Sequence, residues 1–174
     1  CNGGLALAAL YLFEDEPELS ARILHQAIET IPLALEPYGP DGVYPEGVSY
    51  WSYATSYLAL SLSAFESALG TDFGFSQAPG LQESVLFSKI MAGPSGEYYN
   101  FFDAGSGGYM GLSHLGLQAW FARRGACSFP VEEYDAMILE EQDAPVQLKR
   151  TRLYPFFFLE ISMLSRDSYG VDLL

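Results

Sequence analysis

Apolar side chains in this 174-residue chain recur at helical spacing, and this property constrains its fold more than any other. Leu19, Ile23, Ala27 and Ile31 mark one face at four-residue intervals, which is the period of an amphipathic helix. The same criterion predicts a series of short helices joined by loops. Predicted helices cover residues 5–13, 49–70, 81–91, 109–123, 130–141 and 154–165, and a further one begins at Pro17 and is closed at the latest by Pro37 to Pro40.

Prolines and glycines set the expected ends of these helices. Pro32 should kink or end the second helix, and Gly70 should follow the third as its C-terminal cap. Residues 93–108 alternate glycine with aromatic residues, which predicts an irregular or strand-like crossing. We therefore expect an all-α fold with little or no sheet, in the form of a toroid, a solenoid or an irregular bundle. The absence of a clean internal repeat disfavours the common TPR and ankyrin arrays.

Composition and charge exclude several classes of function. Hydrophobic residues make up 49% and charged residues 17% of the chain, which excludes disorder. The net charge of -14 argues against a nucleic-acid or anionic-membrane partner, and no apolar run approaches the ~18 residues of a membrane span. The two cysteines and two histidines lack the spacing of a disulfide framework or a zinc site. We therefore predict neither a bound metal nor a cofactor.

The segment 41–53 is the most distinctive part of the sequence. It contains four aromatic residues, two carboxylates and two glycines, in the order Asp-Gly-Val-Tyr-Pro-Glu-Gly-Val-Ser-Tyr-Trp-Ser-Tyr. It resembles the D-G-x-x-x-E-G-x-x-Y-W-x-Y pattern of the heparinase II/III-like and alginate-lyase-like polysaccharide lyases. Residues 1–4, 68–74 and 94–103 are similar to three further segments of that family, in the same order. The resemblance covers about residues 1–125.

This resemblance implies an (α/α) toroid followed by an antiparallel β-sandwich domain. Residues 1–174 would then form a single helical domain, the C-terminal part of an incomplete toroid of about seven helices, without the downstream β-sandwich. Members of the family cleave uronic-acid-containing polysaccharides by β-elimination and need no cofactor for it. The implied partners are an acidic polysaccharide and the β-sandwich domain of the same chain, in a periplasmic or secreted bacterial setting.

β-Elimination requires a group that neutralises the uronate carboxylate, a base for the C5 proton and an acid for the departing O4. The resemblance puts Tyr50 at the position of the proton-transferring tyrosine, with Tyr53 as the second choice; a core aromatic is the alternative for Tyr50. The neutralising asparagine is expected just before Cys1, and a β-sandwich histidine beyond Leu174. We therefore expect the isolated fragment to be inactive.

Four further residues are candidates for substrate binding, each with a structural alternative. Trp51 and Tyr44 can stack on sugar rings, and Trp51 is equally a candidate core residue. Glu46 is either a substrate-facing carboxylate or a buried one that accepts hydrogen bonds from loop N–H groups or caps the following helix. His114 is either a substrate contact or a core histidine among leucines.

Two other functions stay open at this stage. A family member could bind glycans without cleaving them. An α/α glycoside hydrolase would instead use paired carboxylates such as Glu46 and Asp103. Because the chain has only 8 Lys+Arg, weakly charged, carboxylate-only polymers are favoured over sulfated ones as substrates.

Overall fold

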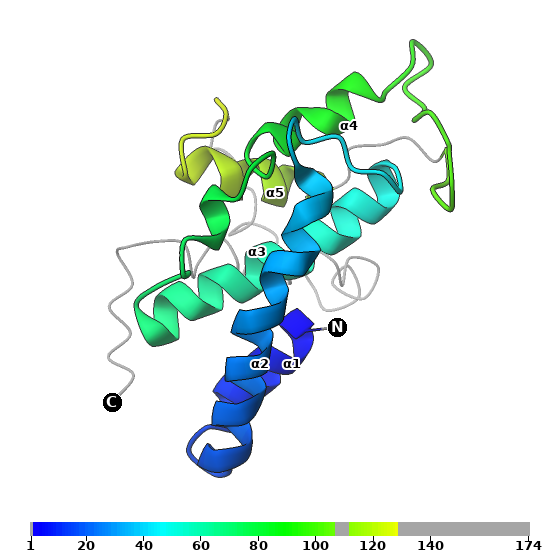
Figure 1. Cartoon of the computed structure of the whole chain (residues 1–174). Coiled ribbons are helices and arrows are strands. Elements are labelled where there is room, and N and C mark those ends of the chain that lie inside the picture. The colour runs from blue at the N-terminus through cyan, green and yellow to red at the C-terminus, as the bar shows by residue number, and fades with distance from the viewer. Residues whose placement is uncertain (1, 107–111, 129–174) are drawn as a thin grey trace, which may run out of the picture.

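The computed structural model describes residues 2–106 and 112–128. Within these ranges the chain is built of helices and turns and contains no sheet, so the predicted all-α fold is confirmed (Figure 1). The seven-helix toroid stays a prediction, because the helices expected at 130–141 and 154–165 lie outside the described residues. None of the helices in the described ranges combines the length and apolar character needed to cross a membrane.

Two antiparallel helices form one end of the fold (Figure 1). Helix α1 spans Asn2–Tyr11 and helix α2 spans Pro17–Leu35, so that a proline begins α2 as expected. Pro32 does not end α2, which continues for three further residues. The missing backbone hydrogen bond costs about 3 kcal/mol, but Ile31 and Leu35 on either side are both buried. Their packing keeps the last turn helical, so of the two outcomes expected at Pro32, a kink or an end, the end is wrong, and α2 ends at Leu35, shortly before Pro37.

Helix α3 is the longest helix among the described residues. It spans Val48–Leu69, one residue earlier at its start than expected. Gly70 follows it with a φ of 72°, and its N–H donates to the carbonyl of Glu66. The predicted left-handed cap is confirmed. Helix α1 packs against one side of α3, and α5 (Leu112–Arg123) packs against another.

The segment between α3 and α5 is irregular. The single helix expected over 81–91 is wrong: a 3₁₀ turn at Glu83–Leu86 precedes one α-helical turn, α4 (Phe87–Ile90). The Ser84 hydroxyl donates to the carbonyl of Leu81 (2.6 Å), a local bond that competes with regular helix. Residues 92 and 98 form one isolated bridge, in line with the predicted irregular crossing.

Candidate functional site

A cleft of about 470 Å³ lies between the start of α1, the C-terminal half of α2 and the middle of α3. The ten residues that line it are all uncharged. Asn2, Tyr53 and Tyr57 bring polar atoms to its wall, and most of the others are small or aliphatic. An apolar pocket with a few convergent polar groups is the usual form of a small-molecule or sugar site.

Tyr53 and Tyr57 face one another across one turn of α3. Their ring centroids are 5.0 Å apart and the ring planes meet at 62°, an edge-to-face arrangement. The side chains are 57% and 37% exposed. Tyr50 lies one turn earlier on the same helix and is 40% exposed, but it does not line the cleft. Of the two tyrosines predicted for proton transfer, Tyr53 is the one in the cleft.

The start of α1 forms the opposite wall, through an unusually close helix contact. A Cβ atom on Gly3 would lie 2.4 Å from the Ser61 Oγ and 3.2 Å from the Tyr57 carbonyl oxygen, so only glycine permits this approach. Asn2 donates from Nδ2 to the Thr30 hydroxyl on α2 (2.7 Å). Neither Asn2 nor Tyr57 was predicted to be a site residue. The two adjacent glycines in an apolar helix were the available signal for a close contact.

Tyr44 and Glu46 lie in the loop that leads into α3. Tyr44 is buried and its ring packs on Tyr38, with 5.1 Å between centroids, so that face is not open to a sugar. Burial raises the pKa of Tyr44, and the charge of Glu46 and a hydrogen bond to it act in the same direction. Glu46 itself is exposed. The N-cap of α3 is Gly47, which makes no side-chain capping bond, so the structure places Glu46 neither as a buried carboxylate nor as the cap.

Trp51 is completely buried, at 0% exposure. Its Nε1 donates to the Ser84 hydroxyl (3.0 Å), and its ring meets Phe87 edge-on at 6.2 Å. Of its two predicted roles the structure therefore shows core packing, because a sugar cannot reach a ring enclosed by its own protein. His114 falls within α5, but its side chain lies outside the described part of the chain.

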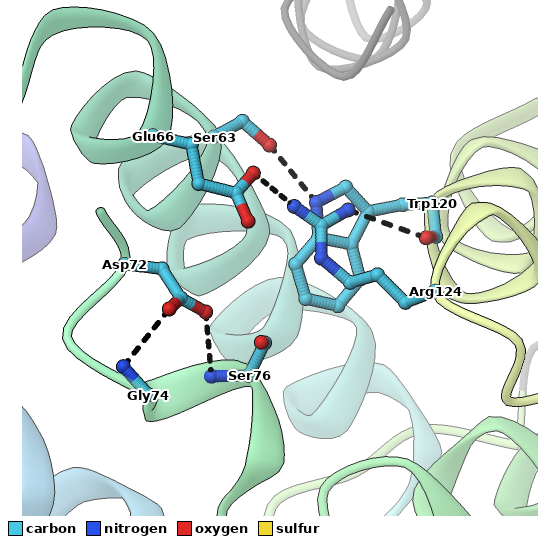
Figure 2. A network of polar contacts seen from close by, with 7 residues as sticks. All are labelled: Ser63, Glu66, Asp72, Gly74, Ser76, Trp120 and Arg124. Atoms are coloured by element: carbon cyan, nitrogen blue, oxygen red, sulfur yellow. Dashed lines mark hydrogen bonds and ion pairs between the residues drawn. The ribbon is translucent and has the colours of Figure 1, made fainter. Parts of the chain in front are cut away.

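A polar network ties α5 to the end of α3 (Figure 2), and none of its residues lines the cleft. The Arg124 guanidinium lies 3.9 Å from the centroid of the Trp120 ring and pairs with Glu66. The Trp120 Nε1 donates to the Ser63 hydroxyl (2.9 Å). A cation over an indole face is attracted by its ring electrons. The network is structural, and it joins Arg124 to a partner 58 residues away in the sequence.

Asp72 stabilises the loop beside this network (Figure 2). Its carboxylate accepts backbone hydrogen bonds from Gly74 (2.9 Å) and Ser76 (3.1 Å). Burial works against the charged form. The bonds to Ser76 and Gly74, together with the charge of Arg124, outweigh it and lower the pKa of Asp72.

We expect Asp72 to contribute to acid sensitivity. A carboxylate whose pKa is lower in the folded state stabilises the fold above its unfolded pKa of about 3.9, and this contribution is lost as pH falls through the lower, folded pKa. The Asp72→Asn variant should therefore lose stability at neutral pH and show a flatter decline of unfolding free energy below pH ~4. Urea denaturation from pH 2 to 7 measures both. Asp41→Asn, at an exposed position with one 3.4 Å backbone contact to Val43, is the matched control, and an equal flattening there would contradict the assignment.

No protein-family model matches the chain, and a search of curated proteins also finds no match. Among the residues that the structure describes, no three His, Cys, Asp or Glu side chains come together in a way that could hold a metal ion. The case for a function therefore depends on the cleft and on the motif that leads into α3.

Proposed function

We propose that the chain is part of a polysaccharide lyase that cleaves a uronic-acid-containing polymer by β-elimination, with Tyr53 as the proton-transferring residue. The observation that carries the proposal is the position of Tyr53 in an uncharged cleft, opposite the start of α1. A periplasmic or secreted location belongs to the same proposal, because a polymeric substrate is met outside the cytoplasm.

The start of α1 supports this choice of site. By the resemblance, the asparagine that neutralises the uronate carboxylate precedes Cys1. Asn2, Gly3 and Gly4 line the cleft together with Tyr53. A residue shortly before them in the parent protein is therefore expected near this end of the cleft. We therefore expect the neutralising group and the proton-transferring group at the same cavity.

The chemistry that Tyr53 would perform is a proton transfer in two directions. Its phenolate removes the C5 proton of the uronate, the electron pair forms the C4–C5 double bond, and the bond from C4 to O4 breaks. The departing O4 takes the proton back from the phenol, which regenerates the phenolate. Such general acid–base steps contribute about 10²–10⁴-fold to a rate.

The test compares two tyrosines on one helix in the parent protein. We expect Tyr53→Phe to lower kcat by at least about 100-fold, because it removes only the proton-transferring hydroxyl. Tyr50→Phe, one turn away and outside the cleft, should retain most activity. Ultraviolet absorbance of the unsaturated product measures both on heparin, heparan sulfate, chondroitin, hyaluronan and alginate.

Three other results would contradict the proposal in different ways. Loss of activity in Tyr50→Phe alone would move the proton-transfer role to Tyr50. Glycan binding without any unsaturated product would favour a binding protein. Hydrolysis products without the double bond would favour a glycoside hydrolase, although neither Glu46 nor Asp103 lines this cleft.

A further inference from the structure

We infer that Tyr57 is a positioning residue, which fixes the orientation of the Tyr53 ring in the cleft. The inference rests on the proposed function, in which the Tyr53 hydroxyl must meet a C5–H bond in a defined direction. Proton transfer needs donor and acceptor within hydrogen-bond reach, and a misplacement of about 1 Å can cost 10²-fold in rate. An exposed tyrosine on a helix surface therefore needs something to hold it.

Tyr57 makes the contact that can do this. Tyr53 is 57% exposed, so solvent covers more than half of its side chain. The Tyr57 ring meets it edge-to-face at 5.0 Å from the next turn of α3. Residues four apart on a helix are neighbours on its surface. The pair restricts Tyr53 to the rotamers that keep this contact.

The backbone at Tyr57 is itself fixed by α1. The Ser61 hydroxyl donates to the Tyr57 carbonyl (2.6 Å), and Gly3 of α1 approaches the same carbonyl and hydroxyl closely. Ser61 is fully buried. The backbone of Tyr57 is thus held at a close α1–α3 contact, and the Tyr57 ring that extends from it contacts the Tyr53 ring.

The partial exposure of the Tyr57 side chain distinguishes a positioning role from core packing. Trp51, on the same helix, is 0% exposed, whereas Tyr57 keeps 37% of its surface open and lines the cleft. Truncating Tyr57 should therefore cost little stability and alter mainly the Tyr53 ring. The ring of Tyr57 is needed for this contact and its hydroxyl is not, so Tyr57→Phe and Tyr57→Ala should behave differently.

Kinetics of the parent protein give the first measurement. We expect Tyr57→Ala to lower kcat about tenfold or more with KM nearly unchanged, since loss of orientation affects the transition state more than substrate binding. Tyr57→Phe should restore kcat to within about twofold of the original. Full activity in Tyr57→Ala would overturn the inference. A Tyr57→Phe variant as slow as Tyr57→Ala would also overturn it, because the hydroxyl would then be the acting group.

A second measurement does not depend on the reaction. In the 174-residue chain labelled with 3-fluorotyrosine, the Tyr53 fluorine resonance, identified through Tyr53→Phe, should shift in Tyr57→Ala and stay close to its place in Tyr57→Phe. An unchanged Tyr53 resonance in Tyr57→Ala would overturn the positioning role even if the parent protein is an active lyase. A shifted resonance in a parent protein without lyase activity would contradict the proposed function and leave the ring contact established.

Discussion

Replacing Trp51 by alanine is expected to lower the free energy of unfolding by about 3–5 kcal/mol, the range for truncation of a large buried aromatic side chain. The indole is 0% exposed and fills the space between α3 and the turn that contains Ser84. Its removal leaves a cavity and also ends the 3.0 Å hydrogen bond from Nε1 to the Ser84 hydroxyl. Urea denaturation of the 174-residue chain measures the change, and an unaltered m-value shows that it arises in the folded state.

Tyr50→Ala is the matched control, because Tyr50 is the neighbouring residue on the same helix and is 40% exposed. Its truncation should cost no more than about 1 kcal/mol, as expected of surface positions. Equal losses at the two positions would mean that the Trp51 ring is not in the core. That result would favour the other role predicted for Trp51, which is stacking on a sugar ring.

The ends of the helices show which structural signals are local. Gly70 was correctly predicted as a cap because a left-handed residue after a helix is a property of a single position. The helix end expected as one of two outcomes at Pro32 was wrong, because the burial of Ile31 and Leu35 against other segments decides whether the helix continues. The prediction of one regular helix over 81–91 was wrong for a similar reason. The Ser84 hydroxyl donates to the Leu81 carbonyl and accepts a hydrogen bond from the Trp51 indole. Trp51 and Ser84 are far apart in sequence, so this second bond could not be predicted from the local pattern.

In the candidate site, too, the features set by local sequence could be predicted and those set by packing between distant segments could not. The segment 41–53 could be recognised as distinctive from its composition alone, and the start of α3 within it was predicted to one residue. Which of its aromatics faces the cleft could not be predicted, because that depends on how α1 and the 3₁₀ turn at Glu83–Leu86 pack around α3. Trp51 and Tyr53 are two residues apart, yet one is enclosed and the other is open. Tyr57 was missed because its role follows from the close approach of Gly3.

Replacing Gly80 by alanine is the second change for which we expect a large loss of stability, about 2–5 kcal/mol. Gly80 has a φ of +79°, which costs a residue with a Cβ atom about 1–2 kcal/mol. The added Cβ would also lie 1.8 Å from the Tyr38 carbonyl oxygen, and forcing such overlap apart adds roughly 1–3 kcal/mol. This overlap can be relieved only if the backbone moves, because the Tyr38 carbonyl also accepts a hydrogen bond from the Gly42 N–H (2.8 Å).

Gly74→Ala separates the two contributions, since Gly74 has a nearly equal φ of +76° but no atom within 4 Å of an added Cβ. It should therefore lose only the conformational part, about 1–2 kcal/mol, and the difference between the two variants measures the steric contact. Because the Tyr38 hydroxyl is hydrogen-bonded to Thr55 in α3 (2.9 Å), movement of residue 38 should also disturb the helix that carries Tyr53. A Gly80→Ala variant no less stable than Gly74→Ala would show that residues 38 and 80 are not in contact in the folded chain.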